Sequence, residues 1–198
     1  MNFELAMAIA TFSFVTSVTP GPNNTFLLTS GANFGVRRSL PYAFGILSGL
    51  SLIMIGIGAG LGVLFATLPV VYQTLKYVGF AYMLFIAYQI VRSTTKNETA
   101  EARYVGFGRS TLFQFVNPKA WIVTASLMAS FIPVNEGLVS TVLYCLLFLA
   151  FTFPGGVIWA LFGHSLKGWL SEPRKRRIFN ITAAVLLVAS MVPVLFLH

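Results

Sequence analysis

The sequence predicts an all-α membrane protein with about six transmembrane helices. Apolar residues make up 57% of its 198 residues and charged residues only 9%, whereas a typical soluble domain carries about 25% charged residues. The mean hydropathy is +0.81. A helix needs roughly 20 apolar residues to cross a bilayer. Six stretches meet this length: 4–36, 40–66, 69–91, 111–132, 138–163 and 178–197.

The first stretch, 4–36, is too long for one straight span and is interrupted by prolines. Pro20 and Pro22 lack amide donors, so a continuous helix cannot pass through them. The fourth stretch, 111–132, has a similar interruption at Pro118. We therefore predict that helices 1 and 4 are each broken into two half-helices.

Both breaks place a proline where a new half-helix starts. Proline suits the first helical position because its missing N–H would be unpaired there anyway, and Gly21 and Asn117, which precede prolines, are disfavoured in helical geometry. The rise per residue places Pro20 about 22 Å from the outer face and Pro118 about 13 Å from the inner face of a core about 30 Å thick. Irregular backbone at this depth is tolerated only inside protein or beside water. The two breaks therefore predict a shared cavity on a transport pathway, in which the free amides and partial positive charge of the half-helix N-termini favour an anionic group.

The other stretches carry fewer signals. In 40–66, glycine pairs four residues apart favour close helix contact, either within the chain or in a homo-oligomer. In 69–91, Lys76 is expected to extend outward to the interface. In 138–163, Pro154, Gly155 and Gly156 form either a gating hinge or a kink that admits a neighbouring helix.

The basic residues predict the orientation, because Lys and Arg near span ends stay in the cytoplasm. Eleven of the thirteen fall in loops of one side: Arg37, Arg38, Arg92, Lys96, Arg103, Arg109, Lys167, Arg174, Lys175, Arg176 and Arg177. Both termini are therefore expected to be periplasmic or extracellular. Residues 1–198 are interpreted as one transporter domain, with inverted three-helix repeats at about 1–92 and 110–198 and a cytoplasmic linker at about 93–109. The run 174–177 is interpreted as an anchor for membrane lipids rather than a nucleic-acid site.

The candidate substrate-binding residues surround the two breaks: Thr19, Pro20, Gly21, Pro22, Asn23, Asn24, Thr25, Asn117, Pro118 and Lys119. Lys119 either contacts a substrate carboxylate at mid-depth or extends toward the cytoplasm. The asparagine amides either bind an ammonium group or satisfy the backbone that proline frees. Thr16 is left out, since a hydroxyl in a membrane helix usually bonds its own preceding turn.

Several classes of function are disfavoured by what the sequence lacks. The single cysteine, Cys145, excludes an internal disulfide and a CxxC metal site. No metal site and no cofactor are predicted. A membrane enzyme acting on lipid needs metal-binding acids or a nucleophile with its base, and such a pair is missing. A lipid-modifying enzyme and a passive channel remain as alternatives.

Three motifs resemble the lysine exporter / homoserine-threonine exporter (LysE/RhtB) family. They are Thr19-Pro20-Gly21-Pro22-Asn23-Asn24, Gly79-Phe80-Ala81-Tyr82 and Phe115-Val116-Asn117-Pro118-Lys119-Ala120. The likeness covers essentially the whole chain, and the nearest branch is that of the cysteine and O-acetylserine exporters. The resemblance implies efflux of amino acids across a bacterial inner membrane, driven by the proton motive force and without a prosthetic group.

The acidic residues narrow the expected substrate. The sequence has no Asp, and its five Glu lie near span ends or in loops: Glu4, Glu98, Glu101, Glu136 and Glu172. A transporter of cationic side chains would pair them with a buried acid, so small neutral amino acids are favoured over lysine or arginine. The same absence leaves His164 and Glu4 as the candidate proton carriers, unless water or the substrate serves.

Overall fold

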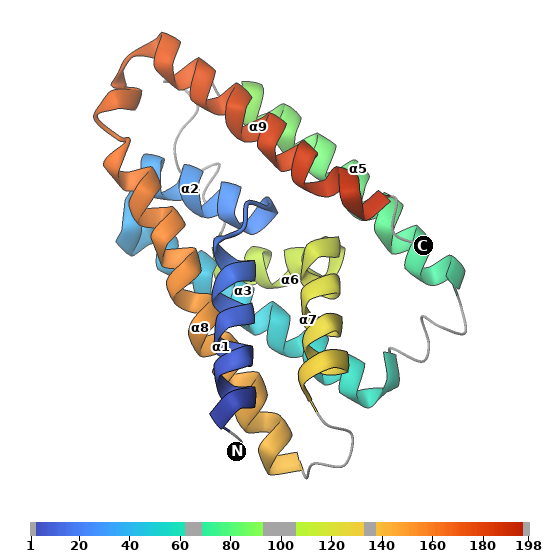
Figure 1. The fold of residues 1–198 in the computed structure, drawn as a ribbon. Helices are drawn as coiled ribbons and strands as arrows, with labels where there is room; N and C mark the ends of the chain where they lie inside the picture. The colour runs from blue at the N-terminus through green and yellow to red at the C-terminus, as the bar shows by residue number, and fades with distance from the viewer. Residues whose placement is uncertain (1–2, 62–68, 93–105, 133–137, 196–198) are drawn as a thin grey trace.

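The computed structural model describes residues 3–61, 69–92, 106–132 and 138–195, and every regular element in these ranges is helical (Figure 1). The elements are α1 (Phe3–Val18), α2 (Pro22–Phe34), α3 (Val36–Gly56), the π-helix η1 (Ile57–Leu61), α5 (Pro69–Arg92), α6 (Phe107–Val116), α7 (Pro118–Phe131), α8 (Leu138–Ser165), the short 3₁₀ helix η3 (Trp169–Ser171) and α9 (Pro173–Leu195). Glu98, Glu101, Glu136, Gly62, most of the predicted linker and the side chain of Lys76 lie outside the described part.

The six predicted stretches correspond to helices, and the first and fourth are divided where the sequence predicts. α1 ends at Val18 and α2 begins at Pro22, while α6 and α7 are separated by Asn117. By length and hydropathy, the segments 36–60 and 138–165 could each cross a membrane, and α1 with α2 forms a third candidate bent by 61°. The all-helical class is confirmed for the described residues. The count of six spans and the inverted repeat stay predictions.

The helices form a main bundle and a separate pair. α8 packs against α1, α2 and α3, and α3 packs against α6. α5 and α9 lie side by side along one flank of this bundle (Figure 1). One apolar core fills the bundle around Ile9, Ile53 and Phe148. A second joins α6 to the pair through Phe113 and Met83.

Small residues allow the closest helix contacts. A Cβ atom at Gly31 or Gly163 would run into the backbone of α8 or of α2 respectively, so these two helices touch through their backbones. Gly45 and Gly49 of α3 also lie close to α6, where an added Cβ atom would overlap the Phe107 carbonyl oxygen and the Gln114 side chain respectively. The predicted contact through glycines in 40–66 is therefore made within the chain for this pair.

α8 passes through Pro154 without a break. Gly155 lies against the Ser17 side chain and Gly156 against Leu27. The structure thus shows close approach by neighbouring helices at this segment, and the gating hinge stays a prediction.

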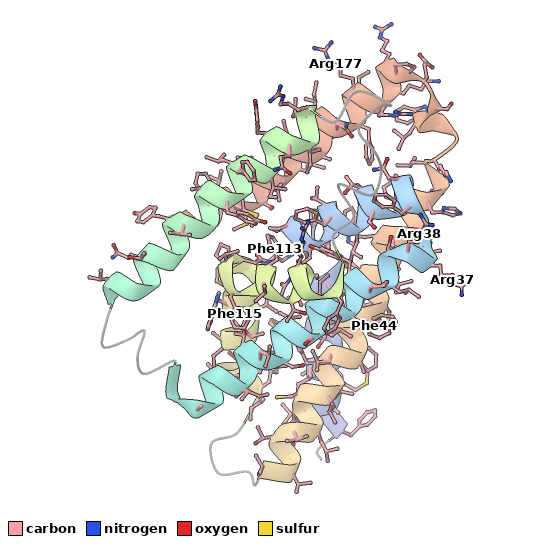
Figure 2. All side chains as sticks on the ribbon, turned by 180° about the vertical axis from the view of Figure 1, so that it is seen from behind. Arg37, Arg38, Phe44, Phe113, Phe115 and Arg177 are labelled. Carbon is pink, nitrogen blue, oxygen red and sulfur yellow. The ribbon has the colours of Figure 1, made fainter. Side chains whose placement is uncertain are left out.

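The basic junctions lie away from the N-terminus. Figure 1 shows the α2–α3 and α8–α9 junctions at the opposite end of the bundle from the start of α1. Arg37, Arg38 and Arg177 extend outward there (Figure 2). Lys175 pairs with Glu172 at 2.8 Å and lies over the Trp169 ring, as expected for a segment at a membrane interface. The orientation itself stays a prediction.

Candidate functional site

Lys119 joins the two helix breaks. Its Nζ atom donates hydrogen bonds to the carbonyl oxygens of Thr19, at 2.7 Å, and Pro20, at 3.2 Å. These carbonyls follow the end of α1, whereas Lys119 lies in the first turn of α7. The two breaks, about a hundred residues apart in the sequence, therefore meet through one ammonium group.

At the break between α1 and α2, side chains bind the free backbone carbonyl groups but do not cap the free amide groups. The Asn24 side chain donates to the carbonyls of Ser17 and Thr19, both at 2.7 Å. At the amide side, Gly21 offers no side-chain cap. The first turn of a helix leaves its amides without intrahelical partners. The start of α2 thus keeps the partial positive charge that suits an anion.

At the break between α6 and α7, side chains of the same segment bind the free backbone groups. The Asn117 side chain accepts a hydrogen bond from the Lys119 amide at 3.2 Å and so caps α7. The indole N–H of Trp121 donates to the Phe115 carbonyl at 2.9 Å. The anion site predicted at the start of α7 is therefore already occupied by a side chain of the protein.

Gln114 ties the two breaks together and was not predicted from the sequence. Its amide exchanges two hydrogen bonds with that of Asn23, at 2.9 and 3.0 Å, and it accepts one from Asn117 at 3.4 Å. Gln114 is fully buried. An amide one helical turn before Asn117, inside an apolar span, was the available signal.

A cavity of about 70 Å³ lies where the breaks meet. At roughly 15 Å³ for one water on the same measure, it holds about five waters. Its polar or small lining residues are Thr16, Ser17, Gly21, Asn23, Asn24, Asn117, Lys119, Thr152 and Gly156. Its apolar lining residues are Leu27, Ala43, Ile46, Leu47, Leu50, Ala120, Val123 and Phe148. Among the described residues that line it, Lys119 carries the only charge.

Thr16 lines this cavity, although it was left out of the predicted site. Its hydroxyl bonds the preceding turn as expected, at 2.7 Å from the Phe12 carbonyl oxygen. The hydroxyl therefore satisfies its own helix while the residue still borders the cavity.

The remaining predicted residues divide into two groups. Pro22, Thr25 and Pro118 are buried in the helix starts, and the Thr25 hydroxyl bonds the Gly21 carbonyl at 3.1 Å. Glu4 and His164 are exposed, near the start of α1 and the end of α8, and do not line the cavity. The structure therefore gathers the residues of the breaks and leaves the two candidate proton carriers apart from them. In the described ranges, no group of three or more His, Cys, Asp or Glu could hold a metal ion.

Comparison with known proteins assigns the family. The sequence profile of the LysE type translocators matches residues 14–196. The chain belongs to the LysE type translocator family. This LysE translocator is similar to proteins named cysteine/O-acetylserine efflux protein. Those of Escherichia coli (strain K12) and Shigella sonnei (strain Ss046) are each 31% identical over 99% of this chain and 100% of the relative. The family is one of translocators rather than enzymes. No solved structure shows a significant match.

Proposed function

We propose that this LysE translocator exports a small neutral amino acid or a close derivative across the bacterial inner membrane. Candidates are cysteine, O-acetylserine, homoserine and threonine. The observation that carries the proposal is the cavity at the meeting point of two helix breaks, with Lys119 as the only charged side chain in its described lining. The names of the full-length relatives, which are efflux proteins for cysteine and O-acetylserine, support it.

The site suits the carboxylate of an amino acid better than a charged side chain. The substrate carboxylate would lie between the Lys119 ammonium group and the uncapped start of α2, whose residues Asn23 and Asn24 also line the cavity. A cationic side chain needs a buried acid, and the sequence has no Asp. Ile46, Leu50 and Phe148 offer an apolar wall to a short, uncharged side chain instead.

Transport would be driven by the proton motive force and would alternate access by rocking of the two three-helix halves. Both termini would be periplasmic, as the distribution of Lys and Arg predicts. Gly155 and Gly156, at the tight contact of α8 with α1 and α2, would act as the hinge. His164 or Glu4 would carry the coupling proton from outside the cavity. Membrane lipids and a possible second copy would be the remaining partners.

Inverted membrane vesicles test this function. We expect them to accumulate radiolabelled cysteine or O-acetylserine only when a proton gradient is imposed, and to leave lysine outside. Lys119→Ala should lower uptake by about ten- to hundredfold, the worth of a hydrogen bond to a charged group, and Pro20→Ala should lower it as well. Lys167→Ala, at an exposed position outside the site, is the matched control.

Normal uptake in both site variants would reject the site. Flux that neither saturates nor depends on the gradient would indicate a channel. If no amino acid moves under any condition, export itself is rejected.

A further inference from the structure

The carbonyl groups that follow α1 bind a cation, the ammonium group of Lys119. Carbonyls at a helix C-terminus lack intrahelical partners and carry the negative end of the helix dipole. Lys119 Nζ lies 2.7 Å from the carbonyl oxygen of Thr19 and 3.2 Å from that of Pro20. Thr19 and Pro20 are exposed. The two carbonyls therefore bind the ammonium group of Lys119, a residue that lines the cavity.

Among the residues that the structure describes, no acid competes for a cation at this place. The described lining of the cavity includes neither Asp nor Glu. Of the glutamates in the described ranges, Glu4 lies in the first turn of α1 and Glu172 beside η3, both away from the breaks. An ammonium group that enters the cavity therefore finds no carboxylate among the described lining residues and must bind to carbonyl, amide or hydroxyl oxygens.

We propose that Lys119 occupies the place of the substrate's ammonium group between transport events, and that an α-amino acid binds by exchanging groups with it. This inference rests on the proposed function. The substrate ammonium takes the carbonyls of Thr19 and Pro20. Its carboxylate takes the released Lys119 ammonium and the uncapped start of α2.

The exchange leaves no charge unpaired. Before binding, Lys119 is paired with the carbonyls, and after binding each of the three charged groups has a partner. An amino acid zwitterion has no net charge, so the charge of the site is unchanged. This matters because an unpaired charge in an apolar site is costly.

Gly21 gives Lys119 room to move. A Cβ atom at this position would lie 2.9 Å from Lys119 Cδ and 3.1 Å from Nζ. The Lys119 stem has four flexible carbons. Because Gly21 has no side chain, this stem can swing from the carbonyls toward the cavity.

The exchange defines the substrate class by two groups together. A compound with a carboxylate but no ammonium group would draw Lys119 away, leaving the Pro20 carbonyl without this partner and the Thr19 carbonyl with Asn24 alone. A compound with an ammonium group but no carboxylate could not displace Lys119. Only a compound with both free groups satisfies the site.

Competition in inverted vesicles tests the exchange in the unaltered protein. Uptake of radiolabelled cysteine is measured against unlabelled cysteine, N-acetylcysteine and cysteine methyl ester. We expect both derivatives to compete about ten- to hundredfold more weakly than cysteine, as for a lost hydrogen bond to a charged group. Equal competition by N-acetylcysteine would overturn the inference, although uptake of cysteine itself would still support the proposed function.

The variant Lys119→Met distinguishes the exchange from a simpler model, in which Lys119 only binds the substrate carboxylate. The variant leaves the carbonyl pair vacant. Cysteine uptake should therefore fall, while the methyl ester should compete with the remaining uptake about tenfold better than in the unaltered protein. Loss of uptake without any gain for the ester would overturn the exchange. Lys167→Met controls for expression and membrane insertion. If the variant does not insert, the competition series on the unaltered protein decides the question.

Discussion

The two helix breaks share a sequence feature, a proline at the start of a half-helix, but only one of the two half-helices is capped. Each places a proline at the start of a half-helix, but the residue before the proline is Gly21 in one and Asn117 in the other. Asn117 caps its own helix. Gly21 has no cap to offer, and the carbonyls beside it depend on Asn24 and on Lys119 from the other break. One break is therefore a closed joint, and the other leaves its helix start without a side-chain cap.

The largest effect on stability is expected at the closed joint. Gly79 of α5 lies against the Val116 carbonyl, and a Cβ atom there would overlap this backbone oxygen. Gly79→Ala should therefore destabilise the fold by about 1–3 kcal/mol, the usual cost of overpacking. The melting temperature of the protein in detergent measures this. Gly108→Ala is the control, since nothing lies within 4 Å of its added Cβ atom. Equal melting temperatures in the two variants would show that the backbone at Val116 shifts to admit the added Cβ atom.

A somewhat smaller effect is expected at the link between the breaks. Gln114→Leu leaves the half-buried Asn23 amide without its partner, and this should cost about 1 kcal/mol, the lower end of the range for an unsatisfied amide. The double variant Asn23→Leu, Gln114→Leu removes both partners and should recover part of this loss. Denaturation of the two single variants and the double variant gives the coupling. Additive losses would mean that the pair contributes nothing as a pair.

Both breaks could be predicted from the sequence because proline acts locally. Pro20, Pro22 and Pro118 each remove an amide donor, and the residues before them, Gly21 and Asn117 among them, are pushed out of helical geometry. Pro154 alone, by contrast, leaves α8 continuous. The depth estimate from the rise per residue brought the two breaks toward a common level. Lys119 and the asparagines could be found for a similar reason, since polar residues within apolar stretches are conspicuous.

What could not be predicted depends on partners that are distant in the sequence. The partner of Gln114 is Asn23, on another half-helix, and the partners of Lys119 are backbone carbonyls, which leave no mark in a sequence. The chemistry of a residue was visible, and its packing partner was not.

The smallest effect on stability, and the sharpest test of the comparison, is expected at Gly21. In contrast to Gly79, the Cβ atom added by Gly21→Ala would meet only the flexible Lys119 side chain, at 2.9 Å from Cδ. Alanine brings no cap either, so the start of α2 stays open, and the loss of stability should stay below about 1 kcal/mol. Uptake should nevertheless fall, because the added Cβ atom crowds the path along which the Lys119 stem swings toward the substrate carboxylate. We expect the substrate concentration for half-maximal uptake to rise by about tenfold, the worth of a weakened hydrogen bond between Lys119 and that carboxylate. A variant that melts early and transports normally would reverse the assignment, because it would make the first break the structural joint.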